Sequence, residues 1–186
     1  MSDTENFILN TTEEMIRQGG YNGFSFRNIA DAIGIKSSSV HYHFETKEKL
    51  GAATAKRYTE NFLIFLGEPD QLKDQGINPV AHYVAAFRGA ITSDNGMCLC
   101  GVLGTEANML PESIVAELNN FFDKNVQWLE RAYEQIGVSG AEERHKQALQ
   151  TLSLLEGAMM ISISKKDIDF FDTAIQIVLD AAERLN

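Results

Sequence analysis

Apolar residues recur along this chain at the spacing of helices. In the first segment, Ile8, Met15 and Ile16 approximate a period of 3.6 residues, and the pattern stops at Gly19 and Gly20. Similar segments follow to the C-terminus, and none sustains the apolar–polar alternation that is typical of a half-buried strand. The pattern therefore predicts an all-α chain.

Capping residues, glycines and prolines divide the chain into about nine predicted helices. Ser25 and Thr46 are expected to cap the second and fourth helices, because their hydroxyls can accept a hydrogen bond from the free amides of a first turn. Pro79 and Pro111 are expected to begin the fifth and seventh helices. The predicted helices cover approximately residues 3–18, 26–33, 37–44, 47–66, 79–91, 97–109, 111–136, 140–164 and 167–184, and residues 68–78 are expected to be a connection without a helix.

Residues 26–44 have the most distinctive pattern. A short helix ending at Gly34, a three-residue turn and a second short helix match a helix-turn-helix, whose second helix enters the major groove of DNA. Small hydroxyl side chains on that helix permit close approach to the duplex, and imidazole and phenol groups can contact phosphates or base edges. The residues concerned are Ser37, Ser38, Ser39, His41, Tyr42 and His43. Lys47 adds a positive charge beside the free amides of the fourth helix, which favours phosphate binding.

The formal net charge of −10 at first argues against a nucleic-acid partner, since cations supply much of the affinity for DNA. The acidic charge is unevenly distributed, however, because residues 1–60 carry a net charge of −1 and the remainder carries −9. Most Lys and Arg residues of the first part follow Ser25. The distribution predicts a basic face on a nearly neutral N-terminal domain, and an acidic body that DNA repels.

The segment FSFRNIADAIGIKSSSVHYHFETKEKL resembles the DNA-binding signature of the TetR/AcrR family of repressors, and the resemblance covers about residues 5–66. It implies an N-terminal three-helix helix-turn-helix DNA-binding domain, residues 1–48. A long fourth helix would join this domain to a C-terminal helical ligand-binding and dimerisation domain, residues 49–186.

The resemblance also implies roles for individual residues. Arg27 matches a position that contacts a phosphate or a base, and Lys47 matches a phosphate-contacting lysine. Many members have Lys where this chain has Ser37, and Tyr where it has His41. We expect Lys36, one residue earlier, to supply the missing lysine charge and to hold a different phosphate.

Large apolar side chains of the C-terminal part fit either a core or the lining of a ligand cavity, because helical spacing does not separate the two. The candidate ligand-binding residues are Phe62, Phe65, Tyr83, Phe87, Met97, Glu106, Met109, Phe122 and Met159. Glu106 lies in the apolar stretch CGVLGTEANML. Its carboxylate either orients a polar or cationic ligand group or lies on a solvated helix face.

The last two helices carry apolar residues that fit either an intramolecular core or, by the family resemblance, a four-helix bundle between two chains. The candidate interface residues are Leu152, Leu155, Met159, Ile163, Phe171, Ile175 and Val178. A twofold dimer would place two recognition helices about 34 Å apart, which is one turn of a palindromic operator.

Motifs of other classes are missing from the sequence. We find no nucleophile elbow, phosphate-binding loop or metal-ligand set, so we expect neither an enzyme nor a cofactor. His41 and His43 cannot chelate one ion, because residues two apart on a helix project about 200° apart. Cys98 and Cys100 are interpreted as buried thiols rather than a redox trigger. The chain has no apolar run of membrane-spanning length, and a cytoplasmic location is expected.

These patterns predict a sequence-specific DNA-binding regulator that acts as a homodimer. We interpret it as a repressor that an unidentified small-molecule effector releases from a palindromic double-stranded operator. The alternative is a DNA-binding regulator controlled by a protein partner or by cysteine oxidation.

Overall fold

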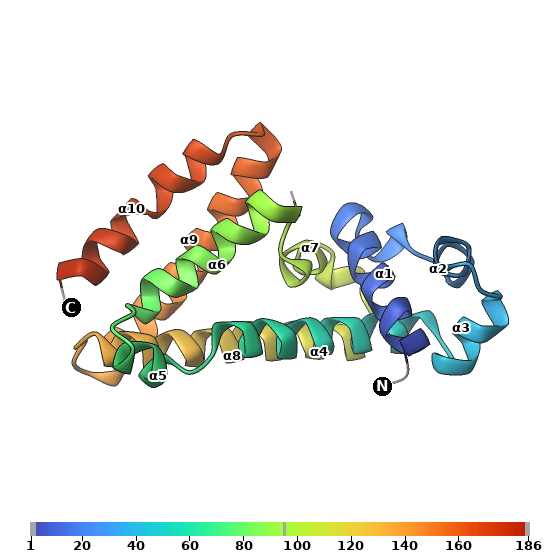
Figure 1. Cartoon of the computed structure of the whole chain (residues 1–186), viewed down its shortest axis with the longest axis horizontal. Helices are drawn as coiled ribbons and strands as arrows, with labels where there is room; N and C mark the ends of the chain where they lie inside the picture. The colour runs from blue at the N-terminus through green and yellow to red at the C-terminus, as the bar shows by residue number, and fades with distance from the viewer. Residues whose placement is uncertain (1–2, 95, 185–186) are drawn as a thin grey trace. The chain divides into compact units, whose positions relative to one another are not determined.

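The computed structural model describes residues 3–94 and 96–184, and every regular element in these ranges is a helix (Figure 1). The predicted all-α class is therefore confirmed. The elements in chain order are α1 (Asp3–Gly19), η1 (Tyr21–Gly23), α2 (Phe26–Ile33), α3 (Ser37–His43), α4 (Lys47–Leu66), α5 (Pro69–Asp74), α6 (Pro79–Asp94), α7 (Leu99–Gly104), η2 (Ala107–Met109), α8 (Glu112–Gln135), α9 (Ala141–Lys165) and α10 (Ile168–Arg184), where η marks a 3-10 helix. No helix among the described residues is both long enough and apolar enough to cross a membrane.

The helices around the turn begin and end where local chemistry predicts. The Ser25 hydroxyl accepts the Asn28 amide at 3.2 Å, and the Thr46 hydroxyl accepts the Lys49 amide at 3.1 Å. Both predicted caps are confirmed. Gly34 closes α2 in the left-handed conformation (φ 73°), which a side chain would disfavour.

The expected connection at residues 68–78 was wrong, because α5 occupies most of it. Pro69 is the first residue of α5, a position that proline favours, and Leu72 is buried. The Trp128 indole also donates a hydrogen bond to the Gly67 carbonyl oxygen at 2.7 Å, just before α5. This partner is distant in sequence, so the local pattern does not reveal it.

The chain divides by packing into two compact units. The first unit comprises Met1–Asn61 and Cys98–Phe121, and the second comprises Phe62–Met97 and Phe122–Asn186. Helices α4 and α8 each contribute residues to both. The first unit is larger than the DNA-binding domain expected at residues 1–48, because α7 packs against α1 and the start of α8 reaches α4.

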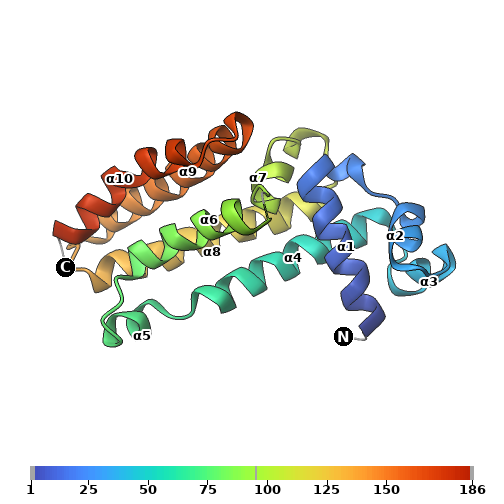
Figure 2. The ribbon, with the colours of Figure 1, turned by 45° about the horizontal axis from the view of Figure 1, so that its top comes forward.

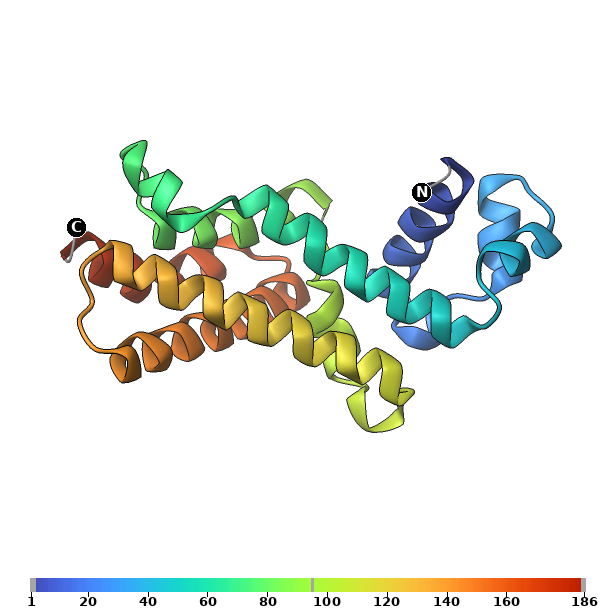
Figure 3. The same ribbon diagram turned by 90° about the horizontal axis from the view of Figure 1, so that it is seen from below.

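In the first unit, α1, α2 and α3 lie beside the first turns of α4, as the blue to teal segments of Figure 3 show. Ile8, Ile16, Ile29, Val40 and Leu50 form its fully buried core. This core leaves the outer side of α3 facing away from the rest of the unit.

A partly buried ion pair joins α1 to α4 in the first unit. The Arg57 guanidinium lies 3.5 Å from the Glu13 carboxylate and 3.4 Å from the Asn6 carbonyl oxygen. Burial raises the pKa of Glu13, and the positive charge of Arg57 partly offsets that rise.

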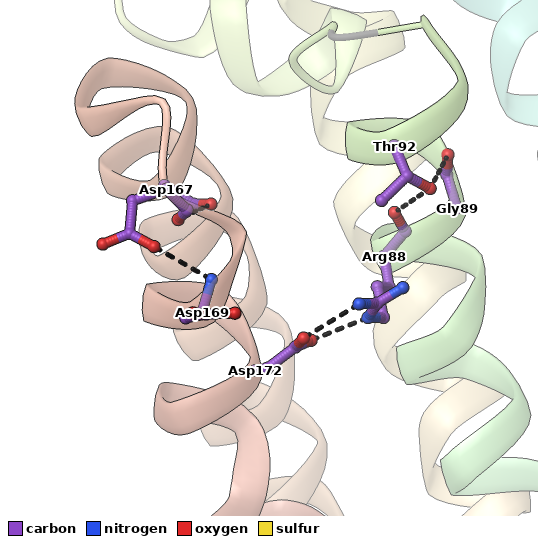
Figure 4. A network of polar contacts seen from close by, with 7 residues as sticks. Arg88, Gly89, Thr92, Asp167, Asp169 and Asp172 are labelled. Carbon is purple, nitrogen blue, oxygen red and sulfur yellow. Dashed lines mark hydrogen bonds and ion pairs between the residues drawn. The ribbon is translucent and has the colours of Figure 1, made fainter.

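In the second unit, α9 and α10 lie side by side, and α6 packs on both (Figure 2). The Arg88 guanidinium of α6 binds both carboxylate oxygens of Asp172 on α10, at 2.7 and 2.9 Å (Figure 4). These charge-assisted hydrogen bonds lower the pKa of Asp172 and raise that of Arg88. The pair connects α6 to α10 at the unit's surface.

Candidate nucleic-acid interface

Helix α3 presents its polar side chains at the surface. Val40 of α3 is fully buried, and Phe44, which follows the helix, is also buried. Ser38, His41 and Tyr42 are exposed, the last at 86% of its surface. The predicted recognition residues therefore lie on the outward side of a short helix that its apolar side anchors.

The remaining predicted residues of α3 are partly exposed. Ser37, Ser39 and His43 flank the exposed side chains. The His41 ring stands edge-on to the Phe26 ring, with centroids 4.4 Å apart, while the His43 ring contacts that of Tyr42. The two imidazoles thus have separate neighbours, as expected for residues two apart. Among the described residues, no three His, Cys, Asp or Glu side chains are grouped as a metal site requires.

Arg27, in the first turn of α2, and Lys36, in the turn before α3, are both exposed. The Arg27 guanidinium lies 3.9 Å from Asp31, one helical turn further along α2. The two side chains are 89% and 74% exposed, so water and salt screen the pair strongly. A phosphate can therefore compete with Asp31 for this guanidinium. Lys36 is the residue immediately before α3.

Lys47, the first residue of α4, has an aromatic environment. Its ammonium lies 4.6 Å from the centroid of the Tyr21 ring and 4.7 Å from that of Phe24. These cation–π contacts restrict where the charge lies. Partial burial lowers the pKa of Lys47, and the Glu106 carboxylate acts in the opposite direction. We did not predict Tyr21 and Phe24 from the sequence, although two aromatic residues within the four positions before the Ser25 cap were a usable signal.

Glu106 lies in the first unit. Its carboxylate accepts a hydrogen bond from the Tyr21 amide at 2.9 Å. Glu106 and Met109, which is 79% exposed, thus belong to a different compact unit from Phe62, Phe65, Tyr83 and Phe87.

The second unit brings three candidate ligand-binding residues together. The ring centroids of Phe62, Tyr83 and Phe87 lie 5.4 to 5.9 Å apart, and Trp128 contacts Tyr83 at 5.3 Å. The Tyr83 hydroxyl donates to the Asn125 side-chain oxygen at 2.6 Å. We call these five residues the aromatic cluster.

The other ligand candidates of the second unit differ in exposure. Phe65 is 67% exposed and stacks on His82, with centroids 6.4 Å apart. Met159 is buried on α9, while Met97 and Phe122 are half-buried. Phe62, Tyr83 and Phe87 are therefore the members of the predicted ligand set that the structure brings together by ring contacts, and Trp128 and Asn125 are additions that the prediction did not include.

The candidate dimer residues are mostly buried within one chain. The buried members are Leu152, Leu155, Met159, Phe171, Ile175 and Val178, while Ile163 is half-buried. Their burial favours the core interpretation, because side chains without exposed surface cannot bury more against a partner. The large apolar residues exposed on α9 and α10 are instead Leu149, Met160, Ile161 and Ile177, with exposures of 44%, 50%, 38% and 69%.

Both cysteines are buried in the first unit. The Gly101 amide donates to the Cys98 sulfur at 3.4 Å. Burial raises the pKa of Tyr58, and the neighbouring Cys98 and Cys100 raise it further. These contacts place the two thiols beside a buried phenol.

Three comparisons with known proteins agree on one kind of protein. The family model described as "Bacterial regulatory proteins, tetR family" matches residues 8–54, from α1 into α4. A TetR transcriptional regulator from Legionella pneumophila is 30% identical, with a TM-score of 0.87 over 97% of this chain and 98% of that chain. A TetR-family regulator from Agrobacterium tumefaciens has the same fold, at 24% identity and a TM-score of 0.84 over 95% and 96% of the two chains.

A curated relative is the "HTH-type transcriptional repressor DhaR" of Mycobacterium sp. (strain GP1). It is 25% identical over 130 residues, which are 69% of this chain and 63% of the relative. The match therefore spans less than two thirds of the relative's length.

Proposed function

Because this chain belongs to the TetR family of transcriptional regulators and not to a class of enzymes, we propose that it is a homodimeric repressor that a small-molecule effector releases from a palindromic operator. The observation that carries the proposal is the outer side of α3. Its polar side chains are exposed, whereas Val40 on the opposite side of the helix is buried in the core of the first unit. A helix that is held from one side and polar on the other can enter the major groove without unfolding.

The proposed contacts fall into two classes. Ser38, Ser39 and Tyr42 would contact base edges or the backbone from α3, and His41 and His43 would flank them. The cations Arg27, Lys36 and Lys47 would neutralise phosphates. Lys47 is suited to this role, because its charge adds to the positive end of the α4 dipole.

The proposed dimer uses the exposed apolar residues of α9 and α10. Leu149, Met160 and Ile161 of α9 and Ile177 of α10 expose apolar surface that the single chain does not bury. A second copy is the natural occupant in a family of operator-binding regulators, because a palindromic site is matched by a twofold dimer. This set replaces the buried residues expected from the sequence.

The proposed effector site is the aromatic cluster of the second unit. Most of the cluster is buried, so a ligand would have to open it; the four rings would then supply apolar contacts, and the Tyr83–Asn125 pair would supply a polar group for orienting the ligand. Phe62 lies on α4, the helix that begins at Lys47. A ligand that shifts α4 would therefore also shift Lys47, and affinities for ligand and operator would be reciprocally coupled.

DNA binding is tested first. Duplexes are selected from a random library with the full-length chain, and the selected duplex is titrated by electrophoretic shift at several salt concentrations. We expect a palindromic consensus with half-sites about 10 base pairs apart, and affinity that falls steeply with salt. The Lys47→Ala variant should lower the salt slope by about one. Failure to enrich any sequence, with equal binding to all duplexes, would contradict the proposal.

Effector control is tested with a library of small metabolites. A true effector must raise the midpoint of thermal unfolding and also weaken binding to the selected duplex. Phe87→Ala should reduce the thermal shift, whereas the exposed Phe65→Ala serves as the control. A compound that stabilises the protein without changing operator affinity is not the effector.

A further inference from the structure

Glu106 makes a contact across the first unit that none of the proposed roles uses. It lies just before η2, 85 residues from Tyr21, and accepts the Tyr21 amide hydrogen bond at 2.9 Å. Helix α7, which precedes it, packs on α1. The carboxylate thus fixes the turn that connects α1 to the helix-turn-helix.

Gly20 shows how closely the carboxylate approaches this turn. A Cβ atom on Gly20 would lie 2.1 Å from the Glu106 Oε1 atom, so a side chain at position 20 would displace the carboxylate. Gly20 also has a φ of 69°, in the region that favours glycine. Glycine at position 20 therefore leaves the space that the Glu106 carboxylate occupies.

The residues that follow this turn hold the Lys47 ammonium. Tyr21 and Phe24 stand edge to face, with centroids 5.6 Å apart, and the ammonium lies within 4.7 Å of both centroids. The contacts form a continuous series from Glu106 to the Tyr21 amide, then to the two rings, and finally to Lys47.

We propose that Glu106 is a positioning residue for operator binding, which holds the Tyr21 turn so that Tyr21 and Phe24 direct the Lys47 ammonium towards a DNA phosphate. The inference rests on the proposed DNA-binding function. The same carboxylate also favours the protonated form of Lys47, because it opposes the lowering of the Lys47 pKa by burial.

Simple electrostatics makes the opposite prediction, which sharpens the test. Removing a negative charge near a DNA-binding surface should strengthen binding to a polyanion. If Glu106 positions Lys47, removing its side chain should instead weaken binding. The sign of the change therefore separates the two explanations.

The experiment compares full-length variants on the duplex selected with the wild-type chain. Glu106→Ala removes the hydrogen-bond acceptor, whereas Glu106→Gln keeps an acceptor oxygen of similar size. We expect Glu106→Ala to weaken binding about tenfold, the size of one charge-assisted hydrogen bond, and Glu106→Gln to have a smaller effect of the same sign. Glu60→Gln, an exposed carboxylate on α4, is the matched control for net charge and should leave binding unchanged or slightly stronger.

A double-mutant cycle tests whether Glu106 acts through Lys47. In the Lys47→Ala background, Glu106→Ala should cause little further loss, and the two single variants should show the same reduced salt slope. A merely structural role would weaken binding equally in both backgrounds and leave the slope unchanged. Thermal unfolding shows whether each variant folds. If Glu106→Ala does not fold, the comparison is made with Glu106→Gln instead.

The outcomes separate the inference from the proposed function. If the wild-type chain selects no sequence, the proposed function fails. If the wild-type chain binds and Lys47→Ala weakens binding, but Glu106→Ala binds equally or more tightly, the inference is overturned and the function stands. The inference is also overturned if Glu106→Ala lowers operator affinity by the same factor in the Lys47→Ala background as in the wild-type chain.

Discussion

Helix α3 and the α9–α10 pair use their side chains in opposite ways. α3 buries Val40 and exposes Tyr42 at 86%, so few apolar contacts hold it. α9 and α10 bury apolar residues along their lengths, including Leu155 and Phe171, neither of which exposes any surface. Substitutions on α3 should therefore change what the protein binds, and substitutions between α9 and α10 should change whether it folds.

The largest effect is expected in the core of the second unit. Phe171→Ala should lower the free energy of unfolding by about 3–5 kcal/mol, because it removes a buried ring and leaves a cavity. Chemical denaturation at fixed protein concentration measures the change. Gln176→Ala, exposed on the same helix, is the control and should stay within about 0.5 kcal/mol of wild type. If the two variants lowered the free energy of unfolding equally, the proposed difference between the buried face of α10 and the exposed face of α3 would be contradicted.

The outer face of the same helices should give the next largest effect. Ile177→Glu places a charge on a residue that is 69% exposed in the single chain and proposed to lie in the dimer interface. The substitution occurs twice in a twofold dimer, so association should weaken by about 3 kcal/mol or more. Sedimentation velocity measures the dissociation constant, and Gln176→Glu on the same helix is the charge-matched control. A variant that remains as dimeric as wild type would show that the interface lies elsewhere.

Helix α3 should show a binding effect without a stability effect. Tyr42→Ala should weaken binding to the selected duplex by about 1–3 kcal/mol, as expected for loss of a specific contact. The midpoint of thermal unfolding should stay unchanged, because the ring is exposed and touches only the His43 ring among the described aromatic contacts. Unchanged affinity, or a large loss of stability, would contradict the assigned role of α3.

The smallest effect concerns the surface pair Arg88–Asp172. Arg88 lowers the pKa of Asp172 in the folded protein, so the pair stabilises the fold at pH values above the unfolded pKa of about 3.9. That stabilisation should disappear as the pH falls through the lowered pKa of the folded state. Unfolding of Asp172→Asn and of wild type is compared across pH. A difference that is the same at neutral and strongly acidic pH would exclude this linkage.

Local chemistry in the sequence determined much of the fold and of the recognition face. Ser25, Gly34 and Thr46 define helix ends through contacts with residues at most four positions away. Both partners of each contact therefore lie in one short segment of the sequence. The polar residues of α3 were also predictable, because a short helix with one apolar stripe must expose its other side. The motif at residues 26–47 depends on this same local information.

Tertiary structure was needed wherever a residue's neighbour is distant in sequence. Helical spacing predicts which side of α9 is apolar, but a core, a ligand cavity and a dimer interface require the same spacing. Only the packing of α10 and α6 showed that Leu155 and Phe171 are core. Likewise, Glu106 was identified as a charge in an apolar stretch, but its partner Tyr21 lies 85 residues away. The chain's periodicity defines faces, whereas the folded arrangement of those faces determines which groups meet.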